Sequence, residues 1–243
     1  MVPVQVTLHV WTIGARDVPG AMADVALDRR RARHTSGVTF AKLLGTTSPG
    51  TFTPRGADLR RWALLTCWES TLAAATFERS DLVRRWDGRA VGVRQRVTMV
   101  PVSSRGSWGG RRPFGAPPRS DQSNAQHHSG DPVAVLTRAL LRPRLIARFW
   151  RSVPPVARAA AAQPGLVIGF GLGEAPVFLQ GTFSLWRSAA EMTAFAHGSP
   201  EHRSAIARTA DVGWYAEELF ARFKVVESSG FGTDDVKASV ARL

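Results

Sequence analysis

Few side chains in this sequence could bind a metal or transfer a proton at neutral pH. There are six histidines and a single cysteine, Cys67. One cysteine excludes an internal disulfide and any metal site built on a Cys-x-x-Cys pair. His127 and His128 are adjacent in a polar stretch and cannot easily converge on one metal ion. His9 alternates with the apolar residues of a predicted strand, so we expect it on the opposite face from them.

His202 is the histidine best placed to bind a metal. Ser199 and Pro200 are typical of an N-cap and a first-turn proline, which puts His202 in the first turn of a helix. The helix dipole disfavours a protonated imidazole there, and the neutral imidazole is the form that binds a metal or a haem iron. No other ligand stands at metal spacing, so the metal must bring its own further ligands, as haem does. A purely structural histidine, or ligation by His197 instead, remains an alternative.

The elements that must position these residues fall into two similar halves. In each half a buried strand ends in Trp, a Ser caps the following helix, and that helix ends in Phe. The residues that align without a gap are Trp68 with Trp186, Ser70 with Ser188, and Phe77 with Phe195. Several matches in the same order indicate an internal duplication.

Each half is predicted as strand–helix–strand–strand–helix–strand, the ferredoxin-like unit. The expected fold class is α+β, with two tandem ferredoxin-like halves packed as a pseudo-symmetric dimeric α+β barrel around an apolar space for a ligand. The halves are residues 1–106 and 132–243, and the second carries the His202 helix. Residues 107–131 are rich in Gly, Pro, Ser and polar amides, so we expect a flexible linker there. Two unrelated α+β modules are the alternative.

Composition narrows the class of protein. The chain has 243 residues, 44% of them hydrophobic, and a formal net charge of +13. Its apolar content excludes a wholly disordered chain, and no stretch approaches the roughly 20 apolar residues of a membrane span. The beginning of the sequence lacks the pattern of a signal peptide, which predicts a cytoplasmic protein. The basic residues are mostly scattered arginines, which disfavours a nucleic-acid partner.

Short motifs in both halves resemble one known family. In the first half they are Lys42–Thr46, Phe52–Pro54 and Pro101–Gly106 with Trp108. In the second half they are Leu141–Arg144 with Phe149 and Trp150, Gly171–Pro176, Thr182–Trp186, and His202 with Ala205, Ile206, Trp214, Glu217–Leu219 and Ala221–Phe223. Together they resemble the spheroidene monooxygenase family of carotenoid biosynthesis, from about residue 36 to 232. Phe231 stands where the family is expected to have Trp.

The resemblance implies a haem-dependent monooxygenase that inserts oxygen into a long apolar polyene. It implies haem b with its iron as the cofactor, dioxygen as a co-substrate, and an external electron donor such as a ferredoxin and its reductase. His202 then becomes the iron ligand. Lys42 and Arg105 lie in two of the motifs and become candidate partners of the haem propionates; a structural role at the surface or at a strand end is their alternative.

The expected lining of the inner space also favours a hydrophobic substrate. Leu166–Leu172 and Val177–Trp186, which should face that space, contain no charged residue, and an ionic substrate could not be desolvated there without cost. Two other functions stay open. One is a haem enzyme of the same fold with different chemistry, such as aldoxime dehydration or N-oxidation, and the other is a non-catalytic protein that binds haem or an apolar ligand. Peripheral contact with a membrane also stays open.

Overall fold

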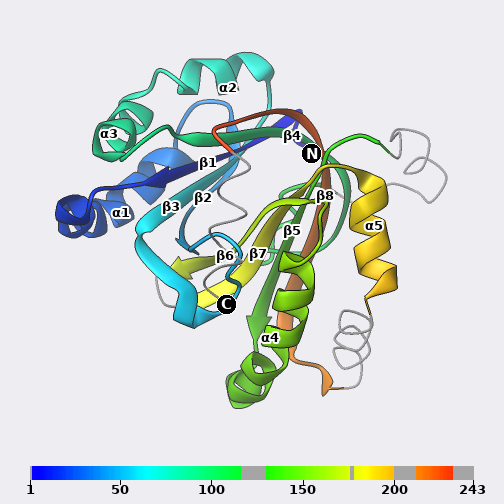
Figure 1. Cartoon of the computed structure of the whole chain (residues 1–243). Coiled ribbons are helices and arrows are strands. Elements are labelled where there is room, and N and C mark those ends of the chain that lie inside the picture. Colours follow the sequence, from blue (N-terminus) through cyan, green and yellow to red (C-terminus); the bar gives the residue numbers. More distant parts are fainter. Residues whose placement is uncertain (1, 116–129, 176–177, 200–211, 232–243) are drawn as a thin grey trace.

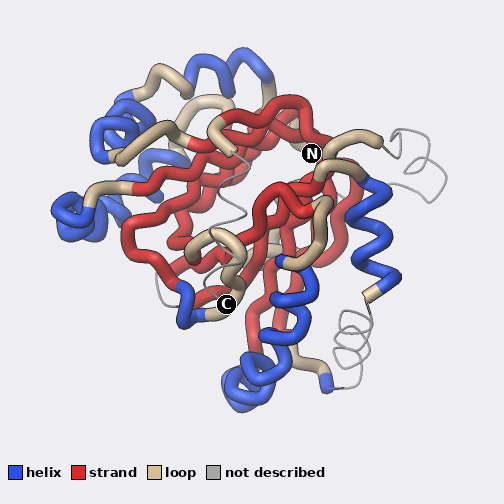
Figure 2. Tube along the Cα trace, viewed as in Figure 1, coloured by secondary structure: helices blue, strands red, loops and turns tan. Residues whose placement is uncertain are grey.

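A closed β-barrel forms the centre of the molecule (Figures 1 and 2). The computed structural model describes residues 2–115, 130–175, 178–199 and 212–231, without the side chains of 175 and 178–180. The strands are β1 (Gln5–Thr12), β2 (Val38–Thr47), β3 (Ala57–Trp68), β4 (Gln95–Gly106), β5 (Val133–Leu141), β6 (Leu166–Ala175), β7 (Phe178–Trp186) and β8 (Tyr215–Ser229). Their order around the barrel is β1-β3-β2-β6-β7-β5-β8-β4, and all neighbours are antiparallel.

The two halves of the chain contribute corresponding strands in the same order. The first half supplies β4-β1-β3-β2 and the second supplies β8-β5-β7-β6. The halves join where β2 pairs with β6 and where β4 pairs with β8. The expected α+β class with ferredoxin-like topology is therefore confirmed.

Helices cover the outside of the barrel. They are α1 (Val18–Arg33), α2 (Thr71–Phe77) and α3 (Asp81–Arg89) in the first half, and α4 (Ile146–Ala161) and α5 (Ala189–Gly198) in the second, with short 3-10 turns η1 (Ala15–Asp17), η2 (Pro54–Gly56) and η3 (Pro143–Leu145). Ser70 and Ser188 cap α2 and α5 as the sequence predicts. Pro154 and Pro155 lie inside α4, which runs through both. Each proline removes one helical N–H donor, and α4 is only half-buried there, so water can reach the carbonyls left without a donor.

Side chains fill the inside of the barrel. Val6, Leu8 and Val10 point inward and join one buried cluster with residues from all eight strands, and His9 lies on the other face as predicted. An eight-stranded barrel is just wide enough for side chains to fill. The expectation of an open apolar space between the two sheets is therefore wrong for the part of the chain that the structure describes.

The start of the expected linker is packed structure. Trp108 and Phe114 are buried within the barrel cluster, and the ring of Phe114 lies 4.9 Å from that of Phe223. Two aromatic residues thus anchor a segment that has no hydrophobic periodicity, and the expected linker does not begin at Ser107. Residues 116–129 lie outside the described part of the chain. Within the described residues, no helix combines the length and hydrophobicity needed to cross a membrane.

Candidate functional site

The outer faces of the two half-sheets can be compared residue by residue. Gln5 of β1 lies opposite Trp68, just as Val133 of β5 lies opposite Trp186. Counting along the strands from these pairs identifies corresponding positions on the faces that the helices cover. The bulky residues His9, Trp11, Leu43 and Leu64 correspond in order to Thr137, Ala139, Gly171 and Thr182. Smaller side chains thus occupy these four positions in the second half.

Side chains fill the outer face of the first half. Trp11 and Trp62 are completely buried, and their rings lie 5.6 and 5.8 Å from the ring of Trp86 on α3. These residues form one buried cluster with apolar residues of α1, α2 and α3. Aromatic side chains of this size contribute much of the burial energy of a core. This face is therefore a second hydrophobic core.

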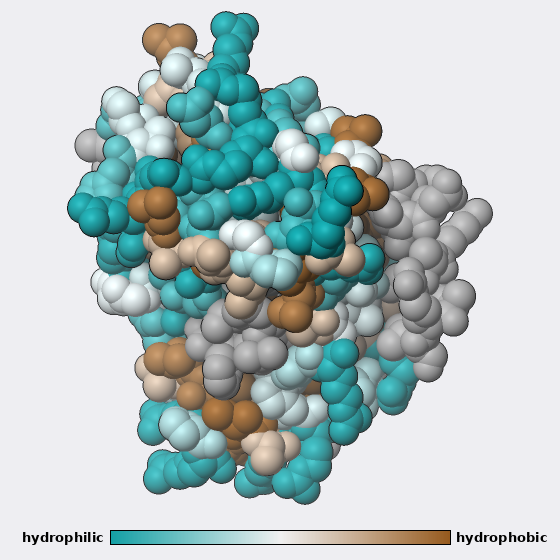
Figure 3. All heavy atoms as spheres, turned by 90° about the vertical axis from the view of Figure 1, so that its left-hand side faces the viewer, coloured by the Kyte–Doolittle hydropathy of each residue, from teal (hydrophilic) through white to brown (hydrophobic). Residues whose placement is uncertain are grey.

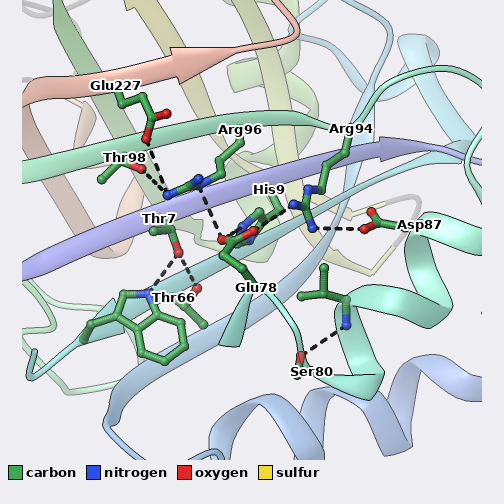
Figure 4. A network of polar contacts seen from close by, with 12 residues as sticks. Thr7, His9, Thr66, Glu78, Ser80, Asp87, Arg94, Arg96, Thr98 and Glu227 are labelled. Atoms are coloured by element: carbon green, nitrogen blue, oxygen red, sulfur yellow. Dashed lines mark hydrogen bonds and ion pairs between the residues drawn. The ribbon is translucent and has the colours of Figure 1, made fainter. Parts of the chain in front are cut away.

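A buried polar network completes the first-half face (Figure 4). His9 is fully buried, and its Nε2 lies 2.7 Å from Oε1 of Glu78. Burial lowers the pKa of His9 and outweighs the opposite effect of the Glu78 carboxylate. The imidazole is therefore neutral at pH 7 and donates its Nε2–H to Glu78. Arg94 and Arg96 also face that carboxylate, at 2.7 and 3.4 Å. This histidine stabilises the core.

The corresponding face of the second half remains partly exposed. The half-buried residues on it are Val135, Thr137, Thr182, Ser184, Phe220 and Arg222. Met192 and Phe195 of α5 pack on Trp186 and Leu166, at one end of the face only. We refer to the six half-buried residues as the open face. Among the described residues, the helices cover this face less completely than the outer face of the first half.

Arg222 is the one charged residue of the open face. It lies between Ser103 of β4 and Val135 of β5. Its Nε is buried and has no hydrogen-bond acceptor among the described residues, although leaving a buried donor unpaired is costly. Arg105, two residues further along β4 than Ser103, lies 5.6 Å from the ring of Phe220 and points to the same side. Two neighbouring guanidinium groups suit a ligand that carries carboxylates.

Aromatic residues gather beside the open face, where α4 begins. The ring of Phe149 lies 5.2 Å from Trp150, 5.9 Å from Trp214 and 6.0 Å from Tyr215. Trp214 is buried, and the other three are half-buried. These contacts hold the first turns of α4 against the beginning of β8, so that the helix lies alongside the sheet.

A polar cluster lies at one end of the barrel interior. Nζ of Lys42 is 3.1 Å from Oε2 of Glu174, whose Oε1 accepts a hydrogen bond of 2.6 Å from Nε1 of Trp108. Arg138 forms an ion pair with Glu217. A cavity beside Trp108, Arg138 and Glu174 has room for about one water molecule. This space is far too small for a cofactor or a polyene.

Glu217 of β8 forms hydrogen bonds with the segment that follows β4. Its carboxylate accepts hydrogen bonds from Oγ of Ser107 at 2.6 Å and from the backbone N–H groups of Gly109 and Gly110 at 3.0 and 2.8 Å. Burial opposes ionisation, but these donors together with Arg138 lower the pKa of Glu217 to about 2. The group is ionised throughout the physiological range, so it suits a structural role better than that of a general acid.

The structure places Lys42 and Arg105, two of the three predicted site residues, on opposite faces of the barrel wall. Lys42 points into the barrel toward Glu174, whereas Arg105 lies on the outer face of β4. His202 lies in residues 200–211, outside the described part of the chain, and His197 is exposed on α5. In the described ranges no three His, Cys, Asp or Glu side chains form a metal-binding group.

Sequence reasoning missed Arg222 and the small residues around it. Arg222 stands inside one of the motifs that carry the resemblance, Ala221–Phe223. The small residues emerge when the alignment of Trp68 with Trp186 is extended onto the neighbouring strands. That comparison needs the strand register, which the sequence pattern alone does not supply.

Solved structures show the same fold with different sequences. An aldoxime dehydratase superposes with a TM-score of 0.56 at 13% identity, covering 91% of this chain and 80% of that chain. A second aldoxime dehydratase structure, in complex with butyraldoxime, also gives a TM-score of 0.56, at 12% identity over 95% of this chain and 80% of that chain. At such identities the likeness concerns the fold alone.

Curated relatives identify the family. No protein-family profile matches the chain. The spheroidene monooxygenase of Rhodobacter capsulatus is 33% identical over 230 residues, 93% of this chain and 92% of that protein. The spheroidene monooxygenase of Rubrivivax gelatinosus is 35% identical over 197 residues, 80% of this chain and 71% of that protein. The resemblance in the motifs thus extends over nearly the whole chain, which belongs to the spheroidene monooxygenase family.

Proposed function

We propose that this protein is a haem-dependent monooxygenase that acts on a carotenoid, and that haem binds between the open face and α4. The family supports a monooxygenase with a carotenoid substrate. One structural observation carries the location: the second half has smaller residues at the positions where the first half has buried His, Trp and Leu, and two of them, Thr137 and Thr182, are only half-buried.

The residues of the open face fit haem. Haem is a flat apolar macrocycle with two carboxylates and an iron that needs an axial ligand. Thr137 and Thr182 leave a half-buried part of the wall without bulky side chains, against which a flat ring can lie. The buried Nε of Arg222, which has no acceptor among the described residues, offers a donor for one propionate, and Arg105 offers a second cation on the same face. Lys42 has no part in this proposal, because it points into the barrel toward Glu174.

His202 is the proposed iron ligand. Ser80 caps α3, and Val83, three residues later, is completely buried in the cluster between the helices and the first-half sheet. His202 likewise stands three residues after Ser199, the serine that follows α5. The gap-free alignment of Trp68 with Trp186 places Gly198 opposite Ser80. With one residue inserted after Phe195, the duplication would align Ser199 with Ser80 and His202 with Val83, a position that faces the sheet.

Haem bound at this site would supply the activation of dioxygen, with electrons from an external donor such as a ferredoxin and its reductase. The chain's own contribution is binding and exclusion of water. Val135 and Phe220, with the aromatic residues at the start of α4, provide apolar contacts for a polyene, and burial of apolar area yields about 25 cal/mol per Å². Arg105 and Arg222 would fix the orientation of the cofactor through its carboxylates.

We also propose that the barrel is the tandem form of a dimeric α+β barrel, with the two halves related by an approximate two-fold axis. The matching strand order of the halves supports this proposal. Superposition of residues 5–106 on residues 133–229 tests it: corresponding strands should coincide, and strands that do not coincide would contradict the duplication.

The test of the proposed function uses the full chain purified and titrated with haemin. We expect a Soret band that shifts on reduction and with carbon monoxide, and incorporation of labelled oxygen into a carotenoid when a ferredoxin, its reductase and dioxygen are supplied. His202→Ala should abolish the histidine-ligated spectrum while the fold persists by circular dichroism. If His197→Ala has that effect and His202→Ala does not, the ligand assignment is wrong.

Two results would overturn the broader proposal. Absence of haem binding would remove the cofactor from it. Conversion of an aldoxime to a nitrile by the haem-loaded protein, without carotenoid oxygenation, would favour the alternative that the shared fold keeps open.

A further inference from the structure

The first part of the second half carries charges of one sign only. Residues 132–173 contain six arginines and no acidic residue. This stretch covers β5, η3, α4 and most of β6. Elsewhere the chain mixes both signs: Arg31 and Arg85 pair with Asp28 on α1, and Arg89 pairs with Asp24.

Four of the six arginines form one exposed stripe along η3 and α4. They are Arg144, Arg148, Arg151 and Arg158. Spacings of three, four and seven residues place side chains on the same face of a helix. The opposite face carries Phe149 and Val153, which are half-buried. We refer to the four residues as the arginine stripe.

Nothing in the described part of the chain neutralises the arginine stripe. No carboxylate of the described residues forms an ion pair with any of the four. Arg148 lies 5.7 Å from the ring of Trp214, and Nε of Arg151 donates to the carbonyl of Ala147. Neither contact removes the charge. A row of like charges costs self-repulsion, which an anionic partner would relieve.

Exposed aliphatic residues accompany the start of the arginine stripe. Leu140 and Ile146 are 38% and 40% exposed, and arginine stems themselves cover apolar surface while their charged ends stay in water. Figure 3, which views the molecule from the left-hand side of Figure 1, shows hydrophobic side chains gathered toward its lower end, with hydrophilic ones around them. Exposed arginines flanked by exposed aliphatic side chains suit the surface of an anionic membrane, where the arginines contact headgroups and the aliphatic groups reach the apolar layer.

We propose that α4 docks the protein on the surface of a membrane that contains anionic lipids. The proposal rests on the proposed function for one reason, the substrate: a carotenoid is an apolar polyene that dissolves in lipid and scarcely in water. Docking through the helix beside the open face places the site close to the phase that holds the substrate. The same stripe could attract an acidic protein, and the experiment decides between the two partners.

The experiment measures binding of the full chain to vesicles by co-sedimentation. Vesicles of phosphatidylcholine alone are compared with vesicles that also contain phosphatidylglycerol. The test variant is Arg144→Gln with Arg148→Gln, Arg151→Gln and Arg158→Gln. The matched control removes four exposed arginines of the first half and the segment after it, Arg30→Gln with Arg55→Gln, Arg79→Gln and Arg112→Gln. Both variants have the same net charge, and circular dichroism checks that both fold.

We expect the wild-type chain to bind the anionic vesicles, less at high salt, and to bind pure phosphatidylcholine at least tenfold more weakly. The test variant should lose at least tenfold in affinity for anionic vesicles, and the control should lose much less, because each basic residue at the surface adds to binding. An equal loss of affinity for anionic vesicles in both variants would show that binding depends on net charge and not on the arginine stripe, and it would overturn the proposal. So would absence of vesicle binding together with stripe-dependent binding to poly-glutamate, which would indicate an acidic protein partner.

A last comparison separates this proposal from the proposed function. Vesicle binding is measured without substrate, so it can succeed even if the chain proves inactive on carotenoids. With active protein, the test variant should turn over a carotenoid in anionic vesicles at least tenfold more slowly than wild type, and at an unchanged rate in neutral detergent micelles. Slower turnover in both would mean that the substitutions damage the site itself, and would contradict a role confined to docking.

Discussion

The outer face of the first half-sheet is a core, and the corresponding face of the second is half-exposed. The first carries Trp11, Leu43 and Leu64, packed under three helices; the second carries Ala139, Gly171 and Thr182 at the same register positions. Both faces belong to one barrel whose strands follow the same order in each half. Backbone hydrogen bonds and the filled interior hold the barrel together, so side chains on the outside can diverge without loss of the fold.

The difference teaches where to look for function in a duplicated fold. A site needs space and unpaired polar groups, and both have an energetic cost. In the first half, side chains occupy that space, and Nε2 of His9 has its carboxylate partner although the buried Nδ1 has none among the described residues. In the second half, Arg222 keeps a buried Nε without an acceptor among the described residues. The half that is less well packed is the better candidate for binding.

The largest effect should come from truncating an aromatic residue on each face. Trp11→Ala should lower the free energy of unfolding by about 3–5 kcal/mol, because it leaves a cavity in a packed core. Phe220→Ala on the open face should cost about 1 kcal/mol or less, because Phe220 is only half-buried. Urea denaturation of the two variants without cofactor measures both. Equal costs would mean that the two faces are packed alike.

The next-largest effect should come from replacing two residues of the open face with their counterparts on the outer face of the first half. Thr137→His together with Thr182→Leu installs the counterparts His9 and Leu64. The fold should survive, since the first half accommodates those residues, but haem affinity should fall about a hundredfold, or about 2.7 kcal/mol. Haemin titration followed at the Soret band measures it, with Thr76→Leu on the exposed side of α2 as a control. Unchanged affinity would place haem elsewhere.

Much of the fold follows from sequence patterns because those patterns are local. The alternation of Val6, Leu8 and Val10 predicts β1 and the outward direction of His9, and the capping serines Ser70 and Ser188 predict where α2 and α5 begin. The match of Trp68 with Trp186 predicts the repeat itself. Each signal depends only on residues close together in the chain.

What the sequence could not supply depends on residues far apart in the chain. The interior is full because eight strands meet there, together with Trp108 and Phe114 from the expected linker. Lys42 and Arg105 were grouped by their motifs, yet they lie on opposite faces of the barrel wall. Arg222 stands out only once its neighbours Ser103 and Val135 are known.

A smaller effect should show whether Arg222 binds a haem propionate directly or only supports the fold. Arg222→Met should weaken binding of haemin about tenfold, because one charge-assisted hydrogen bond to a propionate is lost. It should leave the affinity for haemin dimethyl ester nearly unchanged, since the ester has no carboxylates. Lys224→Met is the matched control, because Lys224 lies on the same strand and pairs with Asp131 at 3.2 Å. An equal loss for both porphyrins would show that Arg222 supports the fold instead.

The smallest effect concerns pH and belongs to the first half alone. Burial lowers the pKa of His9 in the folded chain, while in the unfolded chain its pKa is about 6.5. Below that pH the unfolded chain binds a proton that the folded chain does not, so the free energy of unfolding should decline as the pH falls below about 6.5. For one proton the slope reaches at most about 1.4 kcal/mol per pH unit. Thr137, the counterpart of His9, cannot titrate, so the second-half position adds nothing.

His9→Gln removes the titrating group and keeps an N–H that can donate to Glu78. Its unfolding free energy, measured by urea denaturation of the cofactor-free chain from pH 7.5 to 5.5, should depend less on pH than that of the wild type. His34→Gln, at an exposed histidine, should keep the wild-type slope. The Glu78 carboxylate has a lowered pKa and titrates below this range, so it does not confuse the comparison. Wild-type stability that instead rises as the pH falls would mean that His9 is protonated beside Glu78, and that the first-half core holds a buried ion pair.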